Sequence, residues 1–286
     1  MLISRKRKPI IAGKQEALLH GGKMKRPLYI IFLITGLVIA MALPISAQVE
    51  ESGSLYDIPP RTLVDCPTAM TLPRGCFDII MRVYPNGGIL GRTAIGLSSR
   101  FMVGISYGAE GIIADAEPHW NPDMAFNVKL RLIDESVYFP SLAIGFNSQG
   151  YGSHDDAVDR YTYKSKGFYA VISRGLYLYN ASFGGHVGIN YSLEYDKDKE
   201  KDPNFFVGFD TQFNYNIGFV MEYDLALNDN KSAQYYGKGR GYLHMGVRWL
   251  YSENLEIAVM FKNLLNNRRD VNSFGRGLRL TYIEYF

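Results

Sequence analysis

The sequence predicts an all-β protein that forms a transmembrane, antiparallel, up-and-down β-barrel of about 12 strands. Three observations support this fold class. Apolar and polar residues alternate almost everywhere beyond Phe77, often over about nine or more residues, the length that a tilted strand needs to cross a bilayer. Short links mostly alternate with long polar ones. The chain closes on the apolar and aromatic stretch "LRLTYIEYF".

The composition favours strands and tight turns over helices. The 286 residues include 21 Tyr, 16 Phe and 29 Gly but only 2 Trp, and aromatic residues and glycine are typical of strands and turns. Residues 1–47 hold eight basic side chains and one acidic, so the formal net charge of +3 becomes −4 beyond them, from 23 basic and 27 acidic side chains. No nucleic-acid partner is therefore expected.

Residues 1–47 have the pattern of a leader with a Sec signal peptide. "MKR" supplies a basic start, "PLYIIFLITGLVIAMAL" an apolar core and "PISAQ" a cleavage site after Ala47. We expect translation to start at Met24. The alternative is a single membrane anchor, which is disfavoured because the apolar run from Leu28 to Leu43 is shorter than the ~20 residues of a spanning helix. The mature chain is expected in the outer membrane of a Gram-negative-type bacterium.

Residues 48–76 are expected to form a short periplasmic segment. It contains both cysteines of the mature chain, Cys66 and Cys76, in "DCPTAMTLPRGC". Because an exported chain enters an oxidising compartment, we predict a Cys66–Cys76 disulfide, with two free thiols as the alternative. No second cysteine pair or paired histidine completes a zinc site, so no metal is predicted.

Residues 77–286 are expected to form the barrel. "FDIIMRV" and "FMVGISYG" alternate clearly, whereas "ILGRTAIGLS" between them alternates poorly. "MAFNVKLRL" separates its apolar residues from Asn127, Lys129 and Arg131 almost perfectly. "ASFGGHVGINYSLEY", "IGFVMEYDLALN", "YLHMGVRWL" and "LEIAVMFK" repeat the pattern. The expected strands are 77–85, 88–97, 100–108, 124–132, 138–147, 166–174, 181–195, 204–214, 217–228, 240–250, 254–263 and 276–286.

The links between these strands fit a membrane barrel. Short links such as "SSR", "NYN" and "YSEN" mostly alternate with long polar ones such as "AEGIIADAEPHWNP", "SQGYGSHDDAVDRYTYKS" and "NDNKSAQYYGKG". Outer-membrane barrels have short periplasmic turns and longer outer loops. An even number of strands places both ends of the barrel in the periplasm. The short link "PNGG" departs from the scheme.

The last strand explains the aromatic end of the sequence. "LRLTYIEYF" places Leu280, Tyr282 and Phe286 on the lipid side, and it resembles the carboxy-terminal recognition strand of bacterial outer-membrane barrels. The resemblance implies recognition by the barrel-assembly machinery and periplasmic chaperones. Glu284 falls on the lipid face, where a charge is tolerated only near the membrane interface.

The candidate site is the barrel lumen. Two interpretations of its charged side chains stay open: a self-satisfying network that fills a narrow barrel, or a hydrophilic channel whose charges select solutes. The residues expected to line the lumen, beside Asp78, are Arg82, Lys129, Arg131, His186, Glu194, Asp210, Glu222, Asp224, His244, Arg248, Glu256, Lys262 and Arg279.

No catalytic residue or cofactor is predicted. The sequence has no metalloprotease, nucleophile-elbow, P-loop or dinucleotide-binding motif. A barrel enzyme that modifies lipids would need a serine and a histidine on the outer face, and His186 and His244 fall on the lumen side.

Parts of the barrel resemble the YjbH-like outer-membrane proteins. The stretches are "VKLRLIDESVYFPSLAIGFNSQGYG", "YKSKGFYAVISRGL" and "NFFVGFDTQFNYNIGFVMEYD". The resemblance covers roughly two thirds of the mature chain, rests on strand and turn patterns, and carries fold better than function. It implies an association with exopolysaccharide production and secretion.

Together these observations predict a non-enzymatic barrel: a small pore, or an accessory barrel for polysaccharide export. Its expected partners are outer-membrane lipid, the assembly machinery and chaperones, and polysaccharide-export proteins. The alternatives are a structural or adhesion barrel, whose long loops from Ala109, Gln149 and Asn228 bind ligands outside, and a lipid-modifying enzyme.

Overall fold

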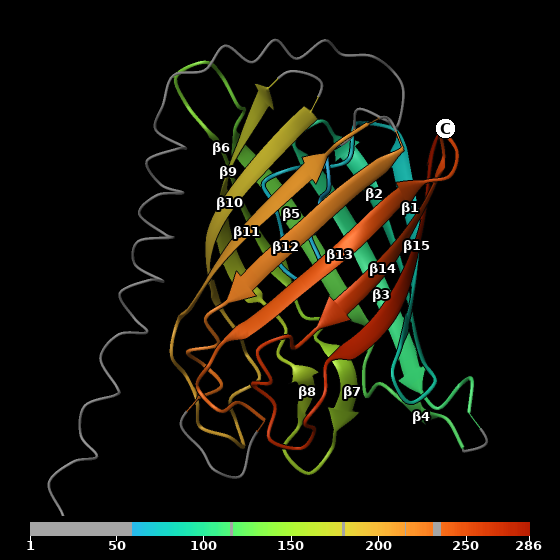
Figure 1. Ribbon diagram of the computed structural model, residues 1–286, viewed down its shortest axis with the longest axis vertical. Helices are drawn as coiled ribbons and strands as arrows, with labels where there is room; N and C mark the ends of the chain where they lie inside the picture. Colours follow the sequence, from blue (N-terminus) through green and yellow to red (C-terminus); the bar gives the residue numbers. More distant parts are fainter. Residues whose placement is uncertain (1–58, 115–116, 179–180, 215, 231–235) are drawn as a thin grey trace, which may run out of the picture. The chain divides into compact units, whose positions relative to one another are not determined.

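The structure, a computed structural model, confirms the predicted fold class. It describes residues 59–114, 117–178, 181–214, 216–230 and 236–286, so the predicted leader (1–47) lies outside the described residues. Twelve antiparallel strands form one closed barrel (Figure 1). They are β1 (Cys76–Tyr84), β2 (Gly88–Ser98), β3 (Phe101–Glu110), β5 (Ala125–Ile133), β6 (Ser141–Asn147), β9 (Gly167–Leu178), β10 (Ala181–Tyr191), β11 (Asn204–Gln212), β12 (Ile217–Asp224), β13 (Tyr242–Leu250), β14 (Leu255–Lys262) and β15 (Gly275–Tyr285).

The barrel closes between its first and last strands. β1 pairs with β15 from Cys76↔Tyr285 to Val83↔Leu278, and every other wall strand pairs with a neighbour on each side. Closure removes the free sheet edge, so each backbone polar group of the wall finds a partner without water. Among the described residues no helix is long and apolar enough to cross a membrane.

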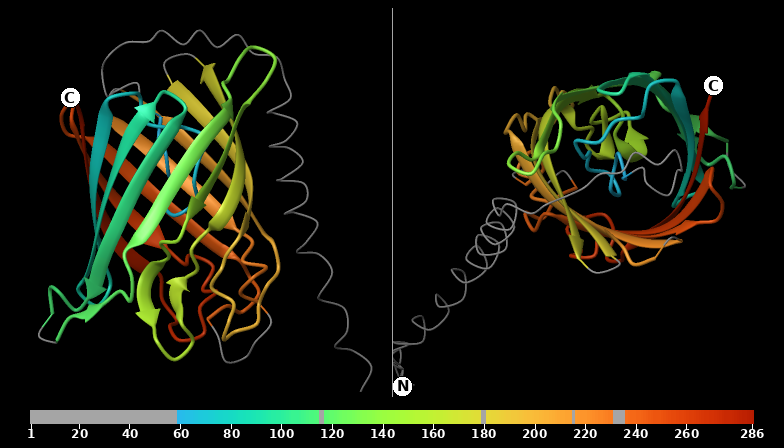
Figure 2. Two further views of the ribbon diagram at one scale, coloured as in Figure 1. Left: turned by 180° about the vertical axis from the view of Figure 1, so that it is seen from behind. Right: turned by 90° about the horizontal axis from the view of Figure 1, so that it is seen from above.

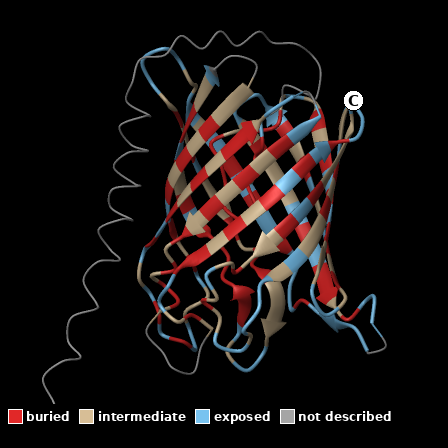
Figure 3. Ribbon diagram, in the orientation of Figure 1, coloured by how far each residue is buried: buried red, intermediate tan, exposed pale blue. Residues whose placement is uncertain are grey.

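The outer face of the wall is apolar. Exposed and buried residues alternate along the strands (Figure 3). Exposed apolar residues on this scale exceed what the surface of a soluble monomer carries, so this face contacts lipid and the chain is an outer-membrane barrel. Outward residues include Ile79, Ile105, Phe126, Val128, Leu130, Ile144, Phe168, Ile172, Phe205, Val247, Val259 and Tyr282.

The two ends of the barrel differ. At the terminal end, where β1 begins and β15 ends, the wall strands are joined by short turns, two residues between β2 and β3 and four between β13 and β14. At the opposite loop end, the connections are mostly long and hold β4 (His119–Trp120), β7 (Tyr151–Asp155) and β8 (Arg160–Tyr163). Short turns face the periplasm, so the loop end is external.

The short link at the loop end has a local cause. Asn86 and Gly87 both have positive φ, 63° and 69°. Tyr84 pairs with Gly88, so three residues connect the strands, and Asn and Gly are the residues that adopt positive φ most readily in such a tight turn. β1 therefore turns into β2 through a three-residue connection and no long loop.

Candidate functional site

The lumen is filled from the terminal end by residues 59–75, here called the plug. Figure 2 shows this segment inside the ring of strands. The plug turns back on itself, since Leu63 N donates to Cys66 O at 2.9 Å and Thr62 forms an antiparallel bridge with Pro67. Leu63, Val64 and Cys66 are fully buried. The expected periplasmic position of this part of residues 48–76 is therefore wrong.

Apolar contacts hold the plug against the inner wall. Leu63 and Val64 pack with Val220 of β12 and Met260 of β14. Further along, Cys66 and Ala69 form a second cluster with the wall residues Ala143, Tyr169, Val171 and Phe206. These inward wall residues are nonpolar because they contact the plug, not water. Burial of such side chains contributes roughly 25 cal/mol per Å².

The wall also has glycines where the plug approaches most closely. A Cβ at Gly96 of β2 would lie 2.0 Å from Pro73 O and 2.8 Å from Leu72 O. These are backbone atoms, which cannot rotate away as a side chain does. The glycine therefore makes room for the returning part of the plug.

Gly96→Ala is expected to displace the plug while the wall stays folded, because overpacking a closed interior costs about 1–3 kcal/mol. Gly91→Ala on the same strand is the control, since its Cβ would lie 3.7 Å from Tyr107 O, an ordinary contact. The readout is labelling of Cys66 by a thiol reagent in the folded barrel. Equal labelling of the two variants would contradict the close fit.

Glu222 of β12 binds the tip of the plug. Its carboxylate accepts hydrogen bonds from the backbone N–H groups of Val64 (2.9 Å), Asp65 (2.9 Å) and Cys66 (2.8 Å). Glu222 is 1% exposed. Three donors on one buried carboxylate compensate for the loss of its hydration.

Asp65 binds the wall in the opposite sense. Its carboxylate lies 3.0 Å from Arg82 Nη1, 2.5 Å from Lys262 Nζ and 3.8 Å from His244 Nε2. Because His244 Nδ1 accepts a hydrogen bond from Asn263 N at 3.0 Å, Nε2 carries the proton that faces Asp65. Three different strands thus contribute to one carboxylate site.

Three wall cations hold the backbone of the plug, and one of them is Arg82, whose Nη2 donates to Val64 O at 2.7 Å. Lys129 Nζ donates to the carbonyl oxygens of Arg61 (2.8 Å), Thr68 (2.9 Å) and Met70 (3.0 Å), and Arg279 Nη1 donates to Leu63 O at 2.7 Å. Carbonyl groups of a segment without sheet neighbours are thereby satisfied.

One further ion pair fixes the entry of the plug. Arg61 Nη2 lies 2.7 Å from Asp78 Oδ2, and Asp78 is fully buried. The plug therefore carries one buried cation and one buried anion, Arg61 and Asp65, and each faces its opposite charge on the wall, whereas Arg74 at the end of the plug is exposed.

The predicted disulfide is wrong, because both cysteines are free and buried. Cys66 lies beside Glu222 at the tip of the plug, whereas Cys76 opens β1 and pairs with Tyr285 at the terminal end. The residues between them run back along the lumen. The two side chains pack in different apolar clusters, Cys66 with Phe206 and Cys76 with Leu72.

His186 connects two wall strands to the plug. Its Nδ1 lies 2.7 Å from Ser173 Oγ and its Nε2 lies 2.6 Å from Asp210 Oδ1. Ser173 Oγ also accepts a hydrogen bond from Ala69 N at 2.8 Å. A Cβ at Gly184 would lie 2.1 Å from Asp210 Oδ1, so this glycine leaves the space that the histidine–aspartate contact occupies.

The remaining predicted residues fall into two groups. In the wall, Arg248 and Arg279 both bind Glu256, at 2.6 and 3.2 Å, and Asp224 forms an ion pair with Lys166. Arg131 and Glu194, in contrast, do not line the deep lumen.

Arg131 lies at the terminal rim, where it binds Asp134 at 2.9 Å and donates to Ser99 O. Glu194 lies beyond the end of β10, because the strand stops at Tyr191 after a register shift. Its carboxylate accepts hydrogen bonds from Tyr161 N and Ser165 N instead. Burial raises the pKa of Glu194, although these donors act in the opposite direction.

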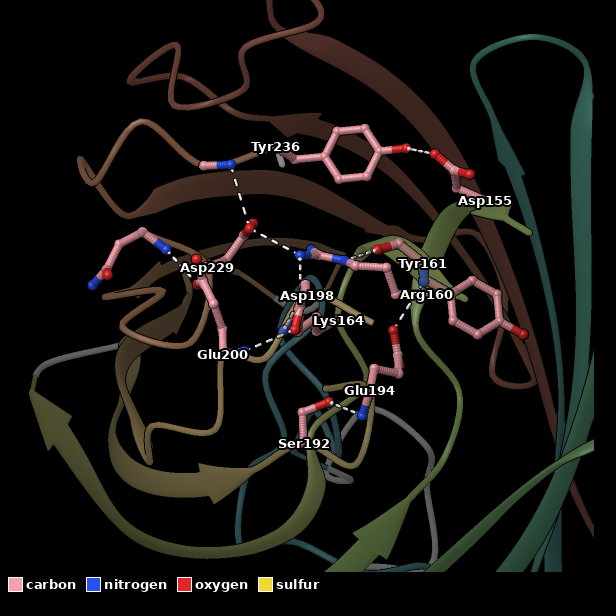
Figure 4. Close-up of polar contacts among 12 residues, drawn as sticks. Asp155, Arg160, Tyr161, Lys164, Ser192, Glu194, Asp198, Glu200, Asp229 and Tyr236 are labelled. Atoms are coloured by element: carbon pink, nitrogen blue, oxygen red, sulfur yellow. Dashed lines mark hydrogen bonds and ion pairs between the residues drawn. The ribbon is translucent and has the colours of Figure 1, made fainter. Parts of the chain in front are cut away.

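The loop end is closed by a second assembly, here called the cap: the β7–β8 hairpin with residues 192–203, 225–230 and 236–241. Arg160 of β8 is fully buried and lies 3.1 Å from Asp198 Oδ2 and 2.9 Å from Asp229 Oδ1 (Figure 4). Burial disfavours the charged form of Arg160, but Asp229 more than compensates and raises its pKa. One cation therefore joins three loops.

Small cavities remain in the described part of the lumen. Four lumen cavities have volumes of about 50, 20, 30 and 10 Å³, and a single water needs about 10–15 Å³. Each therefore has room for one to a few waters. In this conformation these spaces are too small to pass a solute.

No protein-family model and no curated protein matches the chain. Similar solved structures include the KdgM porin (TM-score 0.43, 11% identity, covering 72% of this chain and 98% of that chain) and Acinetobacter baumannii Omp33 (0.42, 10%, 73% and 97%). The NanC porin gives 0.39, 8%, 73% and 99%. Likeness at this level carries no argument about activity. The resemblance to YjbH-like proteins is not supported, since no family model matches.

Proposed function

We propose that the chain is a small, non-enzymatic pore of the outer membrane, closed by the plug and opened when the plug leaves. The observation that carries the proposal is the composition of the lumen. Its wall charges bind a separate chain segment through Glu222, Lys129 and Arg279. In a barrel that is permanently filled by its own wall, the inward side chains need only to pair with one another. When a removable segment fills the lumen, its withdrawal leaves a wall lined by polar residues and glycines.

Single-channel conductance of the refolded mature chain, residues 48–286, tests the proposal. The native chain is expected to be mostly closed with rare openings. Lys129→Met removes the donor to three plug carbonyls and is expected to open the barrel more often. Arg131→Met on the same strand is the control, because Arg131 contacts only the rim. Silence of every variant, with folding shown by heat-modifiable migration on a gel, would refute the pore.

The contacts among Ser173, His186 and Asp210 suggest a hydrolase as an alternative function. Against it, Ser173 is fully buried, and its Oγ accepts a hydrogen bond from the plug. No carbonyl of a substrate has room beside this oxygen while the plug is in place. We therefore interpret the three residues as an anchor for the plug. We expect Ser173→Ala to change the release of the plug, and we expect no hydrolytic activity that this substitution could reduce.

The accessory role in polysaccharide export stays a prediction, because it rests on strand and turn patterns alone. The partners that we propose are those of any outer-membrane barrel, lipid, periplasmic chaperones and the assembly machinery, together with export proteins if that role holds. The adhesion alternative requires mobile outer loops, and two of the three loops expected to bind ligands are part of the cap through Arg160 and Asp229.

A further inference from the structure

The carboxylate of Asp65 occupies a site that belongs to the wall. Arg82 comes from β1, His244 from β13 and Lys262 from β14, and all three face this one group. The Asp65 side chain is 4% exposed. The plug thus contributes one carboxylate, and the wall contributes all of the donors that face it.

The two cations of this site also have contacts outside the plug, although Arg82 Nη2 donates to the plug carbonyl Val64 O at 2.7 Å. The guanidinium carbon of Arg82 lies 4.4 Å from the centre of the Tyr151 ring, and Lys262 Nζ lies 4.0 Å from the centre of the Tyr163 ring. Both tyrosines belong to the β7–β8 hairpin, which enters from the loop end. Cation–π contacts of this kind hold a cation in place at a desolvated site. The site therefore persists when the plug withdraws.

Withdrawal takes the carboxylate of Asp65 away from these cations. In the described part of the chain, no carboxylate other than Asp65 forms an ion pair with Arg82 or Lys262. Glu222 is nearby and loses its own plug N–H donors on withdrawal, so this one carboxylate offsets only one of the two cations and the vacated site keeps a net positive charge. Unpaired buried cations are costly, so an open lumen attracts an anion from solution.

We propose that the wall site of Asp65 binds the carboxylate of an organic anion, and that Asp65 is a tethered mimic of this solute. This rests on the pore function proposed above and names its solute class. A carboxylate that reaches the site competes with Asp65 and so favours the open state, because a ligand that binds one state shifts the population toward it. The faces of Tyr151 and Tyr163 provide contact for the nonpolar part of the solute.

Single-channel recording with glucuronate, glucose and acetate tests the proposal. Glucuronate and glucose differ only by a carboxylate in place of a hydroxymethyl group, and acetate supplies the carboxylate alone. In the native chain, glucuronate is expected to raise the open probability several-fold and to saturate, while glucose has no effect. An acetate response equal to that of glucuronate would assign the whole effect to the carboxylate and none to the ring.

Two plug variants separate the site from simple loosening. Asp65→Asn vacates the cations, so it is expected to open the pore without solute, and glucuronate should then reduce the current by occupying the site. Arg61→Gln breaks the other ion pair of the plug and leaves Asp65 in place, so glucuronate should still increase opening. The proposal is overturned if glucuronate acts like glucose on the native chain and does not reduce the current through Asp65→Asn.

Failure of the pore itself would look different. If the native chain, Asp65→Asn, Arg61→Gln and Lys129→Met are all folded and never conduct, the proposed function is wrong. Calorimetric titration of refolded Asp65→Asn with glucuronate then decides the site alone: saturable heat that glucose does not give supports the carboxylate site, and equal heats for both sugars exclude it.

Discussion

Glu222→Gln is expected to release the plug and to raise the open probability of the barrel about a hundredfold. The carboxylate accepts three backbone N–H groups, at 2.8–2.9 Å. An amide keeps one acceptor oxygen and directs its own N–H groups at these donors. The loss is about 3 kcal/mol of plug binding, since hydrogen bonds to a charged group contribute roughly 1.5–3 kcal/mol each.

The measurement is single-channel conductance, with Glu253→Gln as the control. Glu253 is exposed in the turn between β13 and β14, so the same chemical change there should leave the recordings unchanged. An open probability of Glu222→Gln equal to that of the native chain, with the barrel folded, would show that the carboxylate does not hold the plug.

Arg160→Met is expected to loosen the cap at a cost of about 3–5 kcal/mol, because it removes the cation that the buried carboxylate of Asp229 faces, while Asp198 keeps its ion pair with Lys164. Hydrogen exchange should speed up in residues 192–203, 225–230 and 236–241 and in the β7–β8 hairpin, while the wall strands keep their protection. Both effects are local to the loop end.

Arg100→Met is the matched control at the terminal end. Arg100 also forms an ion pair, with Asp134, but both side chains are largely exposed, at 55% and 43%. Exposed pairs contribute about 0–1 kcal/mol, so exchange should hardly change. Equal exchange in the two variants would mean that Arg160 does not join the loops.

The barrel was predictable from the sequence because the pattern of each strand depends on residues that are neighbours along the chain. Period-two alternation follows from strand geometry, and membrane thickness sets the strand length. The expected strand 204–214 matches β11, and 254–263 matches β14, to within a few residues. Inward placement of Lys129, Glu222 and Arg279 followed from the same alternation.

The plug was not predictable, because its structure comes from contacts far away in the sequence. Residues 59–75 have no period and contain prolines, and their backbone groups are satisfied by residues such as Glu222, more than 150 positions away. A signal was present in the strands. Phe206, Val220 and Met260 are apolar residues on the inward face, and a water-filled channel gives such residues nothing to contact.

The expectations for Glu194 and the disulfide failed for related reasons. Alternation continues past Tyr191 in the sequence, but the strand ends where its backbone partners end. The spacing of Cys66 and Cys76 suggested a small closed loop, whereas tertiary contacts pull Cys66 into the lumen. The pattern of neighbouring residues in the sequence reveals neither the end of the strand nor the position of Cys66.

The most direct test of the plugged lumen is the accessibility of Cys66. In a Cys76→Ser background Cys66 is the only thiol of the mature chain, and it is fully buried at the tip of the plug. A maleimide carrying a large polymer should leave the folded barrel unlabelled and modify it only after unfolding in denaturant. Labelling of the folded, heat-modifiable barrel at the rate of the unfolded chain would place residues 59–75 outside the lumen and contradict the account.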